Sequence, residues 1–242
     1  MWRSCAPTSS SIAAEIRHVK KGEKHMPTVV FALTNALAER EAALEHDAFR
    51  LRMHRAISWL RRSEIPGTDD DIAFICQWIA FNAAYAQELL GFSEKETFRQ
   101  FLEQICSLDT GKMLDSIVWH TFSGPIRTLL DNQYVFQPFW DDMNKEPRGE
   151  GWRLALEKKR AQVRRALGDQ NTAHVLFETF TRLYTLRNQI MHGGATCGGK
   201  VNRAQVRDSR AILAHLLPAI LSVMMDAPQH FQSKPFYPVV DV

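Results

Sequence analysis

The chain has few cysteines, little excess charge and no uninterrupted apolar run typical of a membrane span. Its four cysteines, Cys5, Cys76, Cys106 and Cys197, are scattered over 242 residues, and no two form a CxxC pair. A zinc site needs clustered thiolates and imidazoles, so we expect no metal site. Scattered cysteines favour free thiols in a cytoplasmic protein, and the N-terminus has no apolar stretch typical of a secretory signal.

The most apolar segment, IAFICQWIAFNAAYA, is interrupted by Gln77 and Asn82 and follows three aspartates. It is short for a membrane span, so we expect a buried helix and no membrane partner. The net charge of +3 does not identify a nucleic-acid binder by itself, and local charge has to be considered instead.

Helical spacing of apolar residues runs through most of the chain, and no β alternation competes with it. The sequence therefore predicts an all-α fold. The expected helices cover residues 28–63 with a break, 69–90, 93 onwards, shorter pieces over 110–143, 152–167, 171–192 and 203–225. We expect residues 1–25 to be a flexible extension, residues 26–228 a single domain, and residues 229–242 an irregular tail.

Two stretches are locally basic. Residues 50–62 hold five arginines and no acid, and residues 152–167 hold six basic residues against one glutamate. Either could follow a phosphate backbone, and either could be a solvated helix face. The second has the denser charge, so Arg160, Arg164 and Arg165 are the better candidates for RNA contacts.

The stretch LYTLRNQIMHGG, residues 183–194, places an arginine and a histidine at a predicted helix end. Asn188 and His192 are four residues apart and therefore neighbours on one helix face. Gly193 and Gly194 allow the chain to turn away beside His192. A purely structural interpretation is also open, in which Arg187 forms a surface salt bridge and His192 complements the helix dipole.

Spacing alone carries little weight, because two other arginine–histidine pairs have similar separations. Arg40 and His46 lie in a charged, alanine-rich segment, and Arg210 and His215 lie inside a predicted regular helix. Only Arg187 and His192 occur at a predicted helix end followed by glycines, which makes them the candidate site.

The segment RNQIMH, residues 187–192, resembles the Rx4-6H motif of HEPN domains. The upstream WIAFNAAY, residues 78–85, resembles the first long helix of the Apea-like HEPN group. The resemblance covers roughly residues 46–226. It implies a bundle of four to five core helices, with additional helices inserted over residues 94–150, and frequent homodimers. It also implies metal-independent RNA cleavage at a composite site where two motifs meet, although some members are inactive.

RNA carries its own nucleophile, the 2′-hydroxyl, so cleavage needs only proton transfer and charge stabilisation. Histidine suits proton transfer near neutral pH, and arginine holds phosphate oxygens in a fixed fork. We therefore assign His192 to proton transfer, Arg187 to the phosphate, and Asn188 to orienting either one. Lys200, in the following glycine-rich loop, is expected to border the cleft. Asn82 either orients the motif or hydrogen-bonds within the bundle.

These observations predict a metal-independent endoribonuclease that acts as a cytoplasmic homodimer without a cofactor. The resemblance implies a toxin or phage-defence effector, controlled by an antitoxin or another regulatory protein. The alternatives are a non-catalytic HEPN module that binds RNA or a protein partner, and a structural bundle that mediates assembly.

Overall fold

The computed structural model describes residues 29–40, 47–85, 93–200, 202–235 and 237. These residues form helices joined by short connections, and the described ranges contain no strand element, which confirms the predicted all-α class. The predicted flexible extension over residues 1–25 lies outside the described residues. The chain divides into two compact units, one made of residues up to Leu114 together with those from Leu213 on, the other of Asp115–Ile212.

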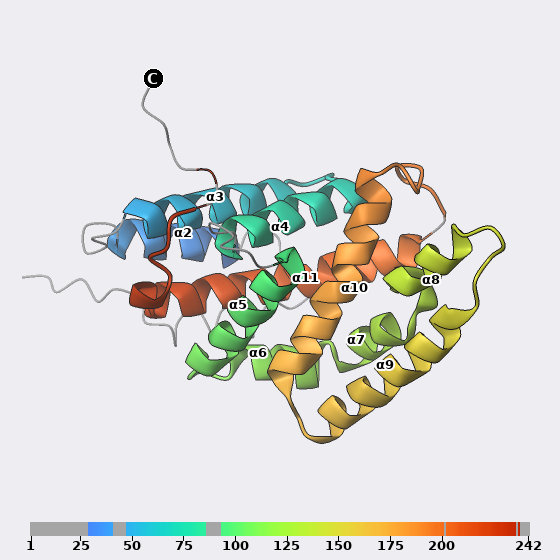
Figure 1. Cartoon of the computed structure of the whole chain (residues 1–242). Helices are drawn as coiled ribbons and strands as arrows, with labels where there is room; N and C mark the ends of the chain where they lie inside the picture. Colours follow the sequence, from blue (N-terminus) through green and yellow to red (C-terminus); the bar gives the residue numbers. More distant parts are fainter. Residues whose placement is uncertain (1–28, 41–46, 86–92, 201, 236, 238–242) are drawn as a thin grey trace, which may run out of the picture. The chain divides into compact units, whose positions relative to one another are not determined.

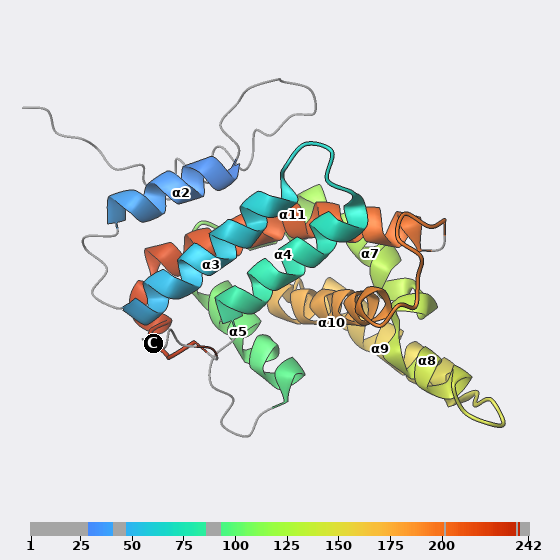
Figure 2. The same cartoon turned by 90° about the horizontal axis from the view of Figure 1, so that it is seen from above.

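The first unit is built around a pair of helices that run side by side, α3 (Asp47–Ser63) and α4 (Asp70–Tyr85) (Figures 1 and 2). Its other helices are α2 (Val29–Arg40), α5 (Glu94–Leu108), the short η4 (Pro228–His230) and the ends of two boundary helices, α6 (Met113–Ser116) and α11 (Arg203–Asp226). Phe49, Met53 and Leu60 on α3 are fully buried, as their helical spacing predicts.

The second unit packs its helices around α10 (Thr172–Met191), which contacts α9 (Gly151–Gly168) and α7 (Ser123–Asp131) (Figure 1). Shorter elements complete the unit: the π-helical turn η2 (Ile117–Thr121), the 3₁₀ turn η3 (Gln133–Val135) and α8 (Gln137–Met143). The shorter helical pieces predicted over residues 110–143 are α6, η2, α7, η3 and α8. The predicted insertion over 94–150 forms α5 to α8 and the connection that follows, and its origin as an insertion stays a prediction.

The connection between α8 and α9 is organised by Asp142. Its carboxylate accepts a hydrogen bond from the backbone N–H of Trp152 at 2.7 Å, and its carbonyl accepts one from Gly149 at 3.0 Å. The pKa of Asp142 is lowered, most strongly by a hydrogen bond from Lys145 and next by the bond from the Trp152 N–H. A Cβ at Gly149 would lie 2.7 Å from the same carboxylate, so the position requires glycine.

Within the described residues, α11 is the one helix long and apolar enough to cross a membrane by length and composition. However, 72% of its most apolar window is buried inside the protein. The core helix of a globular domain has the same properties, so this burial favours packing as the reason for its apolar composition.

Candidate functional site

The predicted motif lies at the C-terminal end of α10, where the helix stops as the glycines predict. Asn171 caps the start of α10, its side chain accepting from the backbone N–H of His174 at 3.0 Å. At the other end the N–H of His192 bonds to the carbonyl of Asn188 at 3.0 Å. Gly193 follows with a φ of +72°, a left-handed conformation that glycine adopts at little cost. The chain therefore turns away immediately after the histidine.

Arg187 is half-buried and has defined partners. Its Nη1 donates a hydrogen bond to Oδ1 of Asn188 at 2.9 Å, and its guanidinium carbon lies 5.9 Å from the ring centroid of Tyr184. Both contacts come from the same helix, so the guanidinium is positioned by residues one and three places away. No carboxylate pairs with Arg187 among the described residues, so its charge remains available to an anion.

His192 is exposed, and its imidazole has no hydrogen-bond partner within the described part of the chain. Residues five apart on a helix differ by about 140° around its axis. Arg187 and His192 of one chain therefore point to different sides of α10. Asn188 bridges part of this separation, because it accepts from Arg187 and lies on the helix face below His192.

The last residues of α7 and the connection to α8, together residues 130–136, are anchored along α10. Arg182 of α10 donates to the carbonyl of Leu130 at 3.1 Å, and its guanidinium lies 4.5 Å from the ring centroid of Phe136. Gln189, inside the motif, donates from Nε2 to the carbonyl of Tyr134 at 2.5 Å. These three contacts hold the segment along α10, and the bond from Gln189 places it beside the motif end of the helix.

The loop after the motif is held to the same glutamine. Asn202 donates from Nδ2 to Oε1 of Gln189 at 2.9 Å, so the loop returns to the helix end from which it left. Lys200, two residues earlier, is exposed. The second unit thus brings the predicted catalytic residues and Lys200 to one end of α10.

The three arginines predicted on α9 differ in their surroundings. Arg164 and Arg165 are exposed, whereas Arg160 forms ion pairs with Asp131 at 3.1 Å and with Glu157 at 2.6 Å. The charge of Arg160 is therefore largely compensated, and its guanidinium also donates to the carbonyl of Asp131. Arg160 joins α9 to the start of the 130–136 segment, so it has a structural role that the sequence did not reveal.

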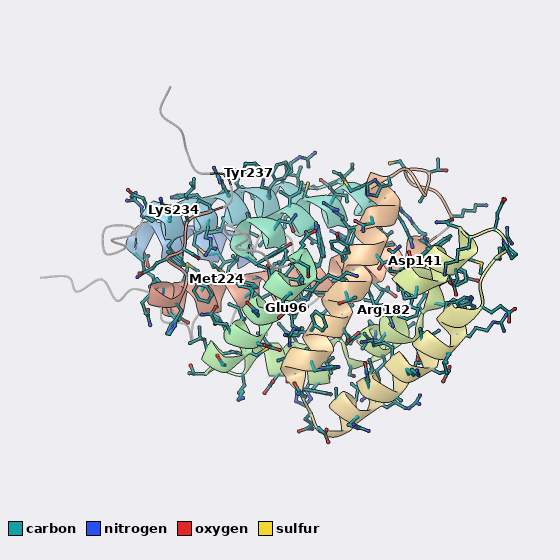
Figure 3. All side chains as sticks on the ribbon, viewed as in Figure 1. Glu96, Asp141, Arg182, Met224, Lys234 and Tyr237 are labelled. Carbon is teal, nitrogen blue, oxygen red and sulfur yellow. The ribbon has the colours of Figure 1, made fainter. Side chains whose placement is uncertain are left out.

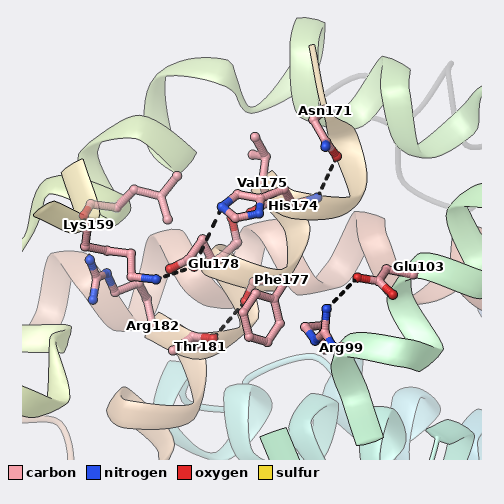
Figure 4. Close-up of polar contacts among 12 residues, drawn as sticks. Arg99, Glu103, Lys159, Asn171, His174, Val175, Phe177, Glu178, Thr181 and Arg182 are labelled. Atoms are coloured by element: carbon pink, nitrogen blue, oxygen red, sulfur yellow. Dashed lines mark hydrogen bonds and ion pairs between the residues drawn. The ribbon is translucent and has the colours of Figure 1, made fainter. Parts of the chain in front are cut away.

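A buried acid of α10 was not singled out from the sequence. Glu178 is 1% exposed and accepts from Nζ of Lys159 on α9 at 2.8 Å, while Nε2 of His174 lies 3.9 Å away (Figure 4). Arg182 lies one turn further along α10 (Figure 3). It is also buried, and burial lowers its pKa to about 10, partly opposed by the charge of Glu178. His174, Glu178 and Arg182 follow one another at intervals of four residues, and this spacing could have indicated a charged cluster on one face of the helix. The cluster fixes α9 against α10.

The arginines of the other basic stretch, on α3, bond to groups of the first unit. Arg52 is buried, donates to the carbonyl of Phe231 at 3.1 Å, and has its pKa lowered to about 10 by burial. The remaining four bond to neighbouring side chains or carbonyls: Arg50 to Asp47, Arg55 to Tyr237, Arg61 to Thr34 and Arg62 to Thr68. This stretch is therefore explained by internal bonding, and the α9 face remains the stronger candidate for an RNA contact.

Asn82 lies on α4 in the first unit and is partly buried. Its Oδ1 is buried without a hydrogen-bond partner among the described residues. Its predicted support of the motif stays a prediction.

The chain was compared with family models, with curated proteins and with solved structures, and none of the three comparisons finds a match.

Proposed function

We propose that the protein is a metal-independent endoribonuclease of the HEPN type, in which the α10 ends of two copies form a composite site. The observation that carries the proposal is the end of α10 itself. Arg187 is positioned by Asn188 without an acidic partner among the described residues, and His192 is exposed beside a glycine turn. The first group suits a phosphate, and the second is accessible for proton transfer.

The angular separation of the two side chains supports the requirement for two copies. Since Arg187 and His192 of one helix point about 140° apart, a second helix end is needed to approach a phosphate from the other side. The two glycines after His192 leave room for that approach. A homodimer in which the two motifs face each other meets this requirement.

The proposed reaction uses the 2′-hydroxyl of RNA as the nucleophile. A histidine removes its proton, the oxygen attacks the adjacent phosphorus, and the bond to the 5′-oxygen breaks as that oxygen is protonated. Arg187 stabilises the charge on the non-bridging phosphate oxygens. The products are a 2′,3′-cyclic phosphate and a 5′-hydroxyl. We propose that the enzyme acts in the cytoplasm, as a toxin or phage-defence effector controlled by an antitoxin or another regulatory protein.

The exposed cations of α9 favour a second candidate, an RNA-binding module without catalysis. Arg164 and Arg165 would hold a phosphate backbone whether or not cleavage follows. This candidate shares the surface of the first and differs only in the chemistry at the end of α10.

A cleavage assay in EDTA tests the proposal. The parent, Arg187→Ala and His192→Ala are incubated with a mixed RNA pool. We expect each substitution to lower the rate by about 100-fold or more, the range typical of losing a proton-transfer or charge-stabilising group. Arg207→Ala and His120→Ala are matched controls, because both residues are exposed in the same unit and outside the motif. They should retain parental activity.

Two results would overturn the proposal. Cleavage by the parent that is unaffected by both motif substitutions would assign activity to another site. RNA binding with no cleavage by the parent would leave the binding module as the function.

A further inference from the structure

Tyr134 is held through its backbone, while nearly half of the residue stays exposed. Its N–H donates to Oδ1 of Asn132 at 2.8 Å, and its carbonyl accepts from Nε2 of Gln189 at 2.5 Å and from Nε1 of Trp140 at 2.8 Å. The residue as a whole is nevertheless 46% exposed. These bonds fix the backbone from which the aromatic ring projects, and none of them involves the ring itself.

Other aromatic rings support Tyr134 from one side. The ring of Phe139 meets that of Tyr134 edge to face, with centroids 5.5 Å apart. Phe139 also contacts Trp140 at 5.1 Å and Trp152 at 5.0 Å in the same manner. Tyr134 is therefore the exposed outer member of a packed aromatic cluster. Such a ring loses little conformational entropy when a flat ligand stacks on it, because its position is already fixed.

The surroundings of the ring indicate which flat ligand it would take. The bond from Gln189 places Tyr134 beside the motif segment 187–192. Arg160 of the basic helix α9 bonds to the carbonyl of Asp131, three residues before Tyr134. Among the described residues of the second unit, the large exposed apolar side chains are Tyr134, Leu154 and Met191, and two of the three lie at or beside the motif. An exposed aromatic ring beside a phosphate-directed site fits a nucleobase.

We infer that Tyr134 is a base-stacking residue that makes the site select unpaired RNA. This inference rests on the proposed function, because it names the form of RNA that the same site takes. A base within a duplex has both faces covered by its neighbours, whereas a base in a loop or single strand offers a face to an aromatic ring. The ring thus holds one unpaired base and sets the register of the phosphate delivered to Arg187.

The test measures RNA binding separately from cleavage. All proteins carry His192→Ala, so that the RNA stays intact, and are titrated against a fluorescent 15-nucleotide RNA without self-complementarity and against its fully paired duplex. Tyr134→Ala is the test variant. It retains the three backbone hydrogen bonds, so loss of folding is not expected. Tyr134→Phe keeps the ring, and Leu154→Ala removes another exposed apolar side chain of the same unit.

We expect Tyr134→Ala to bind the unpaired RNA roughly tenfold more weakly, within the range measured for removing one stacked base. Tyr134→Phe and Leu154→Ala should bind the unpaired RNA as tightly as the parent that carries His192→Ala alone. None of the three substitutions should change binding of the duplex. Equal binding of the unpaired RNA by Tyr134→Ala and the parent would overturn the inference. So would an equal loss on the duplex, or no RNA binding by the parent.

A parallel cleavage assay with His192 intact separates this inference from the proposed function. If binding depends on Tyr134 but the protein does not cleave RNA, the stacking inference stands and the proposed nuclease function fails. If the protein cleaves RNA but binds it equally well without the Tyr134 ring, the nuclease function stands and the stacking inference fails.

Discussion

Arg187 and His192 were chosen from the sequence as candidate site residues because their type and spacing are visible there, together with the glycines that end the helix. The position of Tyr134 beside the motif was not visible in the sequence. Its carbonyl meets Gln189 across 55 positions of sequence, a contact that exists only once the chain has folded. The ion pair between Arg160 and Asp131 could not be predicted from the sequence for the same reason. Contacts distant in sequence decide which charged or aromatic residues are free to bind a partner.

Asp142 provides a test of the polar contacts that shape the second unit. Its pKa is lowered in the folded protein by the bonds from Lys145 and from the Trp152 N–H. The folded state therefore favours the ionised carboxylate, relative to an unfolded-state pKa of about 3.9. Its stabilising contribution is fully present above that value and is lost as the pH falls through the lower folded-state pKa.

We therefore expect Asp142→Asn to unfold at a lower denaturant concentration than the parent at pH 7. This difference should shrink as the pH is lowered below about 4. Urea unfolding of both proteins across pH 3–7 measures it. Asp141→Asn is the matched control, since Asp141 is exposed and accepts a single bond, from Gln137. A difference for Asp142→Asn that stays constant with pH would contradict this account.

The helices were predictable because their apolar residues recur at helical spacing and their ends carry local signals. The helices expected from residues 93 and 171 begin there, capped by Ser93 and Asn171, and Gly193 follows the motif helix as expected. The sequence did not predict which of the two basic stretches has its arginines bonded within the protein and which has them exposed. On α3 the arginines bond to groups of their own unit, whereas on α9 Arg164 and Arg165 remain exposed. Periodicity shows which face is polar, but only packing shows what that face meets.

The contrast among the α9 arginines leads to a prediction about salt. Each phosphate contact to single-stranded RNA contributes about 0.7 to the slope of log K against log salt concentration. Arg164→Ala and Arg165→Ala should each reduce that slope by about this amount, and Lys200→Ala should act in the same way. Arg160→Ala should reduce it less, because Asp131 and Glu157 already compensate its charge.

Fluorescence titrations at salt concentrations from about 50 to about 300 mM measure these slopes, because counterion release dominates the salt dependence of binding in this range. Arg127→Ala is the matched control, an exposed arginine on α7 in the same unit. Slopes that change equally for Arg127→Ala and Arg164→Ala would show a general charge effect in place of an RNA-contacting face on α9.

For the whole molecule, the described residues establish an all-α protein of two compact units, with the predicted motif entirely in the second. The sequence could predict the helical class because helical periodicity is local. It could not predict the division into units, which depends on contacts between distant helices. The single domain over residues 26–228 and the homodimer remain predictions. The proposal requires two copies because one α10 end directs its arginine and histidine to different sides.

The proposed chemistry depends on a single atom of the substrate, the 2′-hydroxyl oxygen at the cleaved linkage. The decisive measurement therefore compares an RNA with the same RNA carrying a 2′-deoxy residue at the mapped cleavage position, both incubated with the parent protein in EDTA. We predict that the all-ribose strand is cut to a 2′,3′-cyclic phosphate and a 5′-hydroxyl, and that the deoxy position resists cleavage. Cleavage at the deoxy position, or products that carry a 5′-phosphate, would contradict the assignment of Arg187 and His192 to this reaction.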